Sequence, residues 1–306
     1  MLVNPLEYLR AGRADGWAVG GFNVYNLESA RAVVAAATNL TAPVMVQTSE
    51  GAVKHAGFDN LASIVRRLAE KAPVPVALHM DHGKSIEVAR EAVGAGYTSV
   101  MIDTSRLPLA ENIAATREIV EYAHDRDVQV EAEIGQLAGI EDLGEVPAEA
   151  TYTVPEEAVR FVAETGVDSL TITIGTSHGA FKFKGEPRLD FDRLAAIAKL
   201  IDNPIVLHGA SAVREDDVAF AERYGARLPK AKGIPEEFIK RAISLGVAKI
   251  NTDSDLRLAA LGRMRQVLAE RPDIFNVYQL MGEVEDAIRA AVEARIRLFG
   301  SERKAM

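Results

Sequence analysis

The sequence predicts a (β/α)8 barrel, because short β-branched runs alternate with Ala-rich amphipathic segments about eight times along the chain. The length of 306 residues suits this fold, which usually takes roughly 250 residues as one domain. No Pro/Ser-rich linker and no shift in composition divides the chain. We therefore expect one TIM-barrel domain over residues 1–306, with residues 281–306 as a C-terminal helical extension.

Eight buried strands are predicted from short runs that are rich in Val, Ile and other apolar residues. Most of these runs are continuously apolar, which is typical of a parallel sheet covered on both faces. They cover residues 18–23, 43–48, 74–80, 99–103, 128–133, 169–174, 204–207 and 248–251.

Helices are predicted between the strands, since apolar residues recur there at three-to-four spacing, with clear patterns that begin at Leu27, Leu61 and Ile113. Residues 281–299 should form a further amphipathic helix over the barrel floor or a neighbouring subunit.

Two loop stretches are longer than a minimal barrel requires. Residues 135–153 lack periodicity and are expected to be a mobile lid, and residues 175–187 form a second loop rich in Gly, Lys and Phe.

The composition excludes several functional classes. With 44 acidic and 35 basic residues, the net charge of -9 argues against a general nucleic-acid or anionic-membrane partner, so a small anionic substrate would need a local cationic pocket. The absence of cysteine excludes disulfides, thiol nucleophiles and Cys-ligated zinc. The chain has no basic leader segment and no apolar run of membrane-spanning length, so we expect a cytoplasmic enzyme.

Histidines follow three of the predicted strands at the end where barrel enzymes carry their sites. His82, His178 and His208 are three of the six histidines in the chain. Three imidazoles with one open position are a standard arrangement for catalytic Zn²⁺. The alternative is that each is an ordinary histidine with a backbone partner. His79 is expected to be a hydrogen-bonded strand residue, with support of the metal site near Asp81 as the alternative. His55 and His124 are expected on the surface.

Small and polar residues after the sixth, seventh and eighth strands favour a phosphate site, because loop amides beside a helix N-terminus bind anions. A lysine in the first of these loops would supply positive charge, although it could equally be a solvated surface residue. No glycine-rich nucleotide-binding loop occurs in the right context, so no nucleotide cofactor is indicated. The candidate phosphate-binding residues are Gly179, Lys182, Gly209, Ala210, Ser211, Asn251, Thr252, Asp253 and Ser254.

Five segments in this order resemble the successive signatures of class II, zinc-dependent fructose-bisphosphate aldolases. They are Asp-His-Gly at 81–83, Val-Glu-Ala-Glu-Ile-Gly at 130–135, Ser-His-Gly at 177–179 with Lys182, His-Gly-Ala-Ser at 208–211, and Ala-Lys-Ile-Asn-Thr-Asp at 248–253. The resemblance runs from Asn4 to residues 299–301, and the compact length resembles the shorter branch that includes tagatose-bisphosphate aldolases. The sequence departs from the family pattern at Ala138 and Ala210, where many members have glycine.

The resemblance implies reversible cleavage of fructose 1,6-bisphosphate to dihydroxyacetone phosphate and glyceraldehyde 3-phosphate. It implies that the three histidines bind Zn²⁺, for which Co²⁺ can substitute, and that Asp103 and Glu133 serve an alternative, buried zinc position. Asp81 matches the residue that donates a proton to the aldehyde oxygen in condensation. Glu141 matches the acid of the mobile loop that removes a proton from dihydroxyacetone phosphate. The alternative for Asp81 is a carboxylate that only orients His82. The alternative for Glu141 is a solvated glutamate of the loop.

The resemblance also assigns the two phosphates of the sugar. It places dihydroxyacetone phosphate against the loops after the sixth, seventh and eighth strands, with a monovalent cation (Na⁺, K⁺ or NH4⁺) nearby. Ser49 and Arg257 match contacts to the distal phosphate. The family resemblance and the terminal helix suggest a homodimer or homotetramer.

Four other functions stay open at this point. Tagatose 1,6-bisphosphate differs from the fructose isomer only at C4, and the sequence does not distinguish them. A Schiff-base aldolase would need a lysine in a strand, for which Lys249 is the only candidate. A zinc hydrolase would usually have a His-x-His pair on the first strand, which instead reads Gly-Gly-Phe-Asn-Val at 20–24. The fourth alternative is a non-catalytic barrel that binds sugar phosphates.

Overall fold

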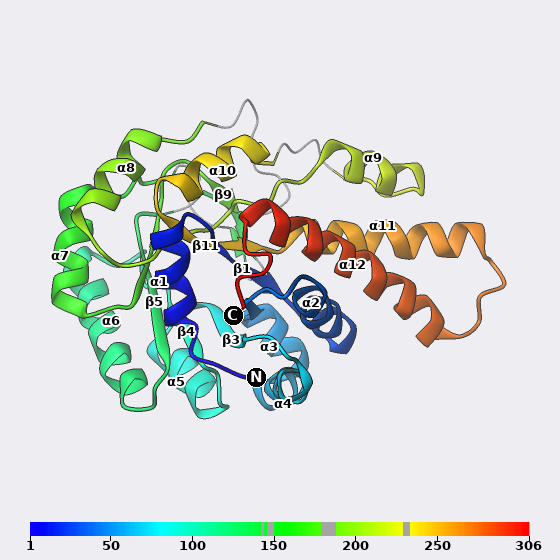
Figure 1. Cartoon of the computed structure of the whole chain (residues 1–306), viewed down its shortest axis with the longest axis horizontal. Coiled ribbons are helices and arrows are strands. Elements are labelled where there is room, and N and C mark those ends of the chain that lie inside the picture. Colours follow the sequence, from blue (N-terminus) through cyan, green and yellow to red (C-terminus); the bar gives the residue numbers. More distant parts are fainter. Residues whose placement is uncertain (137, 142–143, 146–149, 179–187, 229–232, 306) are drawn as a thin grey trace.

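The computed structural model describes residues 1–136, 138–141, 144–145, 150–178, 188–228 and 233–305. Eight parallel strands close into a barrel surrounded by helices (Figure 1), in the order β1-β11-β10-β8-β5-β4-β3-β2. All eight predicted strand regions are barrel strands, so the predicted (β/α)8 fold is confirmed. The strands are β1 (Val19–Asn23), β2 (Val44–Ser49), β3 (Val76–Gly83), β4 (Ser99–Ile102), β5 (Gln129–Ile134), β8 (Ser169–Ile172), β10 (Ile205–Leu207) and β11 (Val247–Thr252).

Helices follow the barrel strands as the apolar spacing predicts, and the patterns that begin at Leu27, Leu61 and Ile113 lie in α2, α4 and α6. The helices are α1 (Leu6–Asp15), α2 (Leu27–Leu40), α3 (Glu50–Ala56), α4 (Phe58–Lys71), α5 (Ile86–Gly94), α6 (Leu109–His124), α7 (Pro155–Thr165), α8 (Phe191–Leu200), α9 (Glu215–Arg223), α10 (Glu236–Ser244), α11 (Ser254–Glu270) and α12 (Val277–Phe299).

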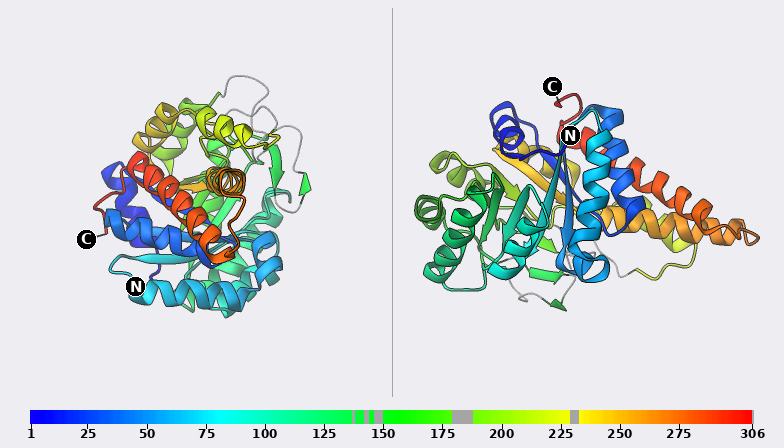
Figure 2. Two further views of the ribbon diagram at one scale, coloured as in Figure 1. Left: turned by 90° about the vertical axis from the view of Figure 1, so that its right-hand side faces the viewer. Right: turned by 90° about the horizontal axis from the view of Figure 1, so that it is seen from below.

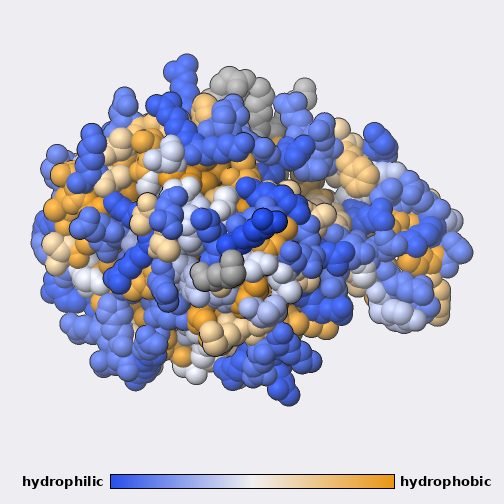
Figure 3. Space-filling model, viewed as in Figure 1, coloured by the Kyte–Doolittle hydropathy of each residue, from blue (hydrophilic) through white to orange (hydrophobic). Residues whose placement is uncertain are grey.

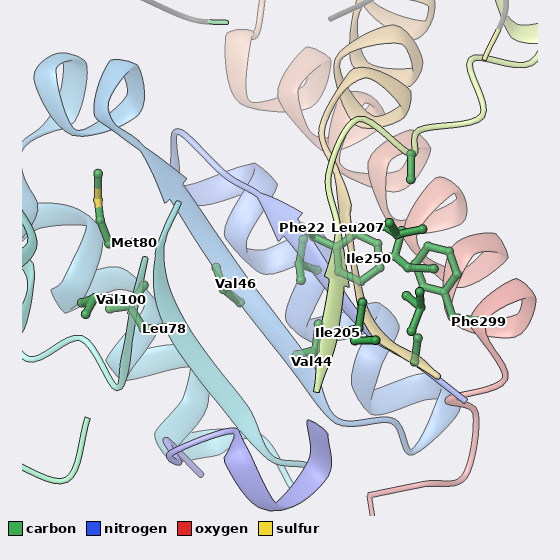
Figure 4. Close-up of a cluster of buried hydrophobic side chains, with 14 of the residues drawn as sticks. Phe22, Val44, Val46, Leu78, Met80, Val100, Ile205, Leu207, Ile250 and Phe299 are labelled. Carbon is green, nitrogen blue, oxygen red and sulfur yellow. The ribbon is translucent and has the colours of Figure 1, made fainter. Parts of the chain in front are cut away.

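The main hydrophobic core lies between the outer face of the barrel and the helices. Figure 4 shows strand side chains such as Val44, Val46 and Leu207 with Phe299 of α12 in this core, and all four are buried. Alternate residues along a strand point to opposite faces, so the other half of each strand faces the barrel interior. That interior contains buried polar side chains, including His79 and Glu131.

Helix α1 closes the floor of the barrel, which the sequence analysis did not predict. Leu9 of α1 and the following Trp17 pack in one buried cluster with Val19, Met45 and Ala77 near the beginnings of the first three strands. Only Leu9 and Gly12 are buried within α1, so its sequence lacks the long apolar stripe that marks an amphipathic helix.

Helix α12 lies on the outer wall rather than over the floor, so the first of its two predicted locations is wrong. It packs against α2 and α11 through a buried stripe that includes Val284, Ile288, Val292 and Ile296. Figures 1 and 2 show α11 and the first part of α12 extending beyond the barrel as a pair. The pattern predicted the helix but could not specify which surface it covers.

The stretch predicted as a loop at 135–153 contains two short strands, β6 (Ala138–Glu141) and β7 (Gly144–Glu145). A third short strand, β9 (Ser177–His178), pairs with β6 in parallel, with Gly139 opposite His178. The expectation of an irregular loop is therefore wrong for these residues. The backbone hydrogen bonds join the two segments that leave β5 and β8.

In the described part of the chain, no helix combines the length and apolar character needed to cross a membrane.

Candidate active site

Charged and polar side chains gather where the barrel strands end. Asp81 and His82 lie at the end of β3, Asp103 follows β4, Glu133 is near the end of β5, and His208 follows β10. Carboxyl ends of parallel strands meet at one face of a barrel, which brings residues distant in sequence together. The structure thus joins five of the residues predicted to bind metal or move protons.

His82 lies among carboxylates. Its Nδ1 is 3.0 Å from Oδ2 of Asp103 and 3.9 Å from Oε2 of Glu133, and its Nε2 is 4.0 Å from Oδ1 of Asp81. Burial favours the neutral imidazole, but the attraction of Asp81 and Asp103 outweighs it and raises the pKa of His82 to about 10. This pocket therefore attracts a positive charge.

The backbone of His82 is in the left-handed region, with φ 53°. Residues other than glycine rarely adopt this conformation. The conformation places the imidazole beside the carboxylates that follow β4 and β5, which are 3.0 and 3.9 Å away.

His208 is completely buried and contacts two glutamates of β5. Its Nε2 is 3.0 Å from Oε1 of Glu131 and its Nδ1 is 3.6 Å from Oε2 of Glu133. Its ring centroid is 4.5 Å from that of His82, with the ring planes 65° apart. Burial and His82 favour the neutral form, but the two glutamates raise the pKa of His208.

Two overlapping groups of side chains in the described residues could hold a metal ion. Asp81, His82 and His208 form one group, and His82, Asp103 and Glu133 form the other; within each, ligand atoms lie within 4.8 Å of one another. Oε2 of Glu133 is buried and has no hydrogen-bond partner among the described residues, which would be costly without a cation. Imidazole and carboxylate are ligands that Zn²⁺ accepts, so the residues present fit zinc.

The third predicted zinc ligand is on the neighbouring short sheet. His178 lies in β9, whose backbone pairs with β6, but its side chain is outside the part of the structure that is described. Glu141 lies in β6, and its side chain is likewise not described. Gly179 and Lys182 lie outside the described residues. The roles of these four residues stay predictions.

Asp81 is held by two asparagines at the mouth of the barrel. Asn23 donates from Nδ2 to Oδ2 of Asp81 over 2.7 Å, and Asn251 donates to Oδ1 over 2.8 Å. Gln47 in turn donates to Oδ1 of Asn23. Burial would raise the pKa of Asp81, but His82 and other nearby cationic groups lower it to about 2. Asp81 is therefore a carboxylate over the whole neutral range.

The loops after β10 and β11 lie side by side, as a phosphate cradle requires. Oxygens of Asp255 accept from the amides of Ala212 and Val213 over 3.2 and 2.7 Å, which ties the loop after β10 to the beginning of α11. Gly209 has φ 62°, a conformation that favours glycine. The other predicted residues of these loops are Ala210, Ser211, Asn251 and Thr252, which are buried, and Asp253 and Ser254.

The predicted contacts to the distal phosphate, Ser49 and Arg257, come from two different parts of the chain, and Arg257 lies in the same helix turn as Ser254 of the cradle. Ser49 ends β2 next to Asp81 in the barrel register, and its hydroxyl accepts a hydrogen bond from the Ala52 amide at the start of α3. Arg257 is half exposed, and its Nε is 2.8 Å from Oδ1 of Asp253. Its guanidinium thus reaches back toward the first turn of α11.

Sequence reasoning missed a set of polar residues inside the barrel. Asn23 and Gln47 support Asp81, while Glu131 contacts His208. Their signal was a polar residue at an inward position of an otherwise apolar strand. His79 is buried and hydrogen-bonded to Ser99, as predicted, and His55 and His124 are exposed, as predicted. Lys249, the residue that a Schiff-base mechanism would need, is completely buried with Nζ 2.8 Å from Oε2 of Glu131.

The fold and the site together define a barrel protein whose rim carries histidines and carboxylates that could hold a metal ion. The chain belongs to the family described as "Fructose-bisphosphate aldolase class-II", whose profile it matches over residues 3–304. A fructose-bisphosphate aldolase of Thermus caldophilus is 48% identical over 302 residues, covering 98% of this chain and 99% of that protein. A fructose-bisphosphate aldolase of Helicobacter pylori strain J99 is 43% identical, covering 99% of this chain and 100% of that protein. The crystal structure of the YdjI aldolase of Escherichia coli K12 is 33% identical with a TM-score of 0.82, covering all of both chains.

Proposed function

We propose that this protein is a zinc-dependent lyase that reversibly cleaves fructose 1,6-bisphosphate into dihydroxyacetone phosphate and glyceraldehyde 3-phosphate. The observation that carries the proposal is the meeting of Asp81, His82 and His208 at the barrel rim, where their possible ligand atoms lie within 4.8 Å of one another. Cleavage of a carbon-carbon bond beta to a ketone needs a base for the C4 hydroxyl proton and stabilisation of an enediolate. The membership of the family and the names of the relatives support this reaction.

Zinc would be held by His82, His178 and His208, with Asp103 and Glu133 available for an alternative, deeper position. When bound, zinc would supply Lewis acidity toward the ketone and hydroxyl oxygens of the sugar. The carboxylates around His82 favour a cation at this place even before zinc is considered. Co²⁺ is expected to substitute for zinc, because it accepts the same ligands.

Asp81 would take the proton of the C4 hydroxyl during cleavage and return it to the aldehyde oxygen during condensation. Its low pKa keeps Asp81 ionised at neutral pH, which is the protonation state that a base requires. Asn23 and Asn251 each donate to one of its oxygens, so the carboxylate is fixed in orientation. Fixed orientation lowers the entropy cost of reaching the transition state.

Glu141 would move the proton at C3 of dihydroxyacetone phosphate. It lies in β6, within the segment after β5, and the pairing of β6 with β9 brings this segment next to that of His178. A base carried on such a segment would act when the segment covers the substrate.

The phosphate of dihydroxyacetone phosphate would bind to the loops after β9, β10 and β11. Gly209, Ala210 and Ser211 would offer amides and a hydroxyl, and residues 251–254 lead into the N-terminus of α11, which favours an anion. Gly179 and Lys182 would complete this cradle, with a monovalent cation (Na⁺, K⁺ or NH4⁺) nearby. Ser49 and Arg257 would contact the distal phosphate.

We further propose a homodimer or homotetramer that works in the cytoplasm. Three apolar side chains are exposed where α11 and α12 are joined: Phe275 in the turn and Val277 and Tyr278 at the start of α12, with 93%, 70% and 73% of their surface accessible. Figure 3 shows apolar residues among hydrophilic ones on the lobe that these helices form. Exposed apolar side chains are typical of contact surfaces between subunits.

The test of the proposed substrate is a coupled cleavage assay with fructose 1,6-bisphosphate and tagatose 1,6-bisphosphate side by side. We expect efficient cleavage of the fructose isomer and slower cleavage of its C4 epimer. A preference for the tagatose isomer would support the related activity of the same family, and cleavage of neither would contradict the proposal.

A further inference from the structure

A fully buried polar cluster lies inside the barrel behind His208. It joins Glu131 on β5, Thr171 on β8, Lys249 on β11 and His79 on β3, and none of these side chains has accessible surface. Buried charges are unfavourable unless they are paired and hydrogen-bonded, so the cluster must be specifically arranged. The reaction proposed above uses none of these four residues.

Both carboxylate oxygens of Glu131 are engaged. Oε1 accepts from Thr171 Oγ1 over 2.9 Å and is 3.0 Å from His208 Nε2, while Oε2 accepts from Lys249 Nζ over 2.8 Å. The hydroxyl of Thr171 and the ammonium group of Lys249 both donate to Glu131, so the Glu131 carboxylate is the acceptor in each of these contacts.

An acceptor at this place determines the proton position on His208. A carboxylate without a proton can contact Nε2 favourably only if Nε2 carries the hydrogen. In the neutral ring the lone pair is then on Nδ1, the atom that lies 3.6 Å from Glu133 Oε2. This Glu133 oxygen is buried and has no hydrogen-bond partner among the described residues.

We propose that Glu131, held in place by Lys249, is a positioning residue for zinc binding: it fixes the tautomer and the ring orientation of His208 so that Nδ1 is the metal-binding atom. The inference rests on the zinc site of the proposed function. It also assigns Lys249 a role: its ammonium group neutralises Glu131 and occupies Oε2, which keeps Oε1 directed at His208. A second partner, Nε2 of His79, is 3.2 Å from Nζ and fixes the ammonium group from the other side.

The competing interpretation is that Glu131 and Lys249 only stabilise the barrel. Both interpretations predict lower stability after substitution, so stability alone does not separate them. A structural pair would leave the zinc affinity of the folded protein unchanged. A positioning pair would change it, because removal of the carboxylate that orients a metal-binding histidine typically weakens metal binding about 10- to 100-fold.

The experiment uses the full-length protein, stripped of metal, and measures the zinc dissociation constant by competition with a chromophoric chelator. The variants are Glu131→Gln, Lys249→Met and the double variant. The matched control is Glu285→Gln, which also converts a buried, ion-paired carboxylate to an amide but contacts Arg31 on the outer wall. Circular dichroism and thermal unfolding of the metal-free proteins show whether each variant is folded.

We expect Glu131→Gln to bind zinc about 10- to 100-fold more weakly than the wild-type protein. Lys249→Met should also weaken binding, and the double variant should be no weaker than the more severe single variant, because Lys249 acts through Glu131. Glu285→Gln should bind zinc as the wild-type protein does. Absorption bands of the Co²⁺-loaded protein should change in the first two variants and not in the control, since they report the ligand geometry.

Unchanged zinc affinity and an unchanged cobalt spectrum in a folded Glu131→Gln variant would overturn this inference and leave the proposed function intact. If the wild-type protein bound no zinc, both this inference and the proposed zinc-dependent function would be wrong. If Glu131→Gln did not fold, Lys249→Met would decide: weaker zinc binding supports the inference, and wild-type affinity contradicts it. Additive losses in the double variant would show that Lys249 does not act through Glu131.

Discussion

Asn251 donates a hydrogen bond to Oδ1 of Asp81 over 2.8 Å and so connects the ends of β11 and β3 across the mouth of the barrel. These two strands are separated in the barrel by β1 and β2. Asn23 at the end of β1 donates to the other oxygen. The carboxylate that we assign to proton transfer is therefore oriented by two strands besides its own.

Replacement of Asp81 by Asn should reduce the turnover number about 10²- to 10⁴-fold, because the amide cannot accept a proton. The zinc content should stay normal, which metal analysis of the purified variant checks. Asp59→Asn is the matched control, since Asp59 is exposed on α4, and it should retain wild-type turnover. Loss of zinc together with turnover would instead make Asp81 a residue that organises the metal site.

Replacement of Glu141 by Ala should slow the exchange of the C3 proton of dihydroxyacetone phosphate more than it weakens binding of that ligand. The exchange can be followed by NMR in deuterated water. Glu145→Ala, in β7 of the same segment, is the control and should exchange at the wild-type rate. Equal exchange rates in wild type and Glu141→Ala would remove Glu141 from the mechanism.

Zinc should bind more tightly as the pH rises from 6 to 8. In the metal-free protein the pKa of His82 is raised to about 10 by its carboxylate neighbours, so the ring is protonated at neutral pH. Zinc must displace this proton, and one displaced proton lowers the dissociation constant about tenfold per pH unit. Chelator competition at several pH values measures this slope. A dissociation constant independent of pH would show that His82 is neutral in the metal-free site.

The free energy of unfolding of the metal-free protein should fall as the pH rises, whereas the zinc affinity increases. A raised histidine pKa stabilises the folded state below the ordinary value of about 6.5, and this stabilisation is lost as the pH rises through about 10. Urea unfolding of the metal-free protein at pH 6 and pH 9 measures the difference. Asp103→Asn removes the closest carboxylate partner of His82 and should reduce the difference in the free energy of unfolding between the two pH values.

Borohydride treatment in the presence of substrate should not trap a covalent adduct. Lys249 is the lysine that a Schiff-base mechanism would require, but it is completely buried and its ammonium group is paired with Glu131. A buried amine that is held by a carboxylate is a poor nucleophile. Mass spectrometry of the treated protein checks the result, and an adduct on Lys249 would contradict the zinc mechanism.

The sequence was sufficient to predict the strands because each is an apolar, β-branched run bounded by polar or turn residues. It was also sufficient to predict which residues meet at the rim, since in a parallel barrel the residue after every strand faces the same end. The structure brings the predicted rim residues together: His82 Nδ1 lies 3.0 Å from Oδ2 of Asp103, and Nδ1 of His82 and of His208 lie 3.9 and 3.6 Å from Oε2 of Glu133.

The interior of the barrel could not be predicted in the same way. The sequence places Glu131 and Lys249 in strands but does not show that they meet, because this depends on the barrel register from β5 through β8 and β10 to β11 rather than on either segment alone. A charged residue between apolar neighbours, as in Val-Glu-Ala-Glu at 130–133, is the pattern that indicates an inward-facing partner. Helix α1 was missed because its buried face consists of Leu9 and Gly12 alone.

The central claim is that a metal at the rim of this barrel is required for aldol cleavage. The most direct measurement is the rate of cleavage of fructose 1,6-bisphosphate by the protein before chelation, after removal of metal with EDTA, and after addition of zinc to the stripped protein. We predict that chelation abolishes cleavage and that zinc or cobalt restores it. Full activity of the metal-free protein would contradict the account.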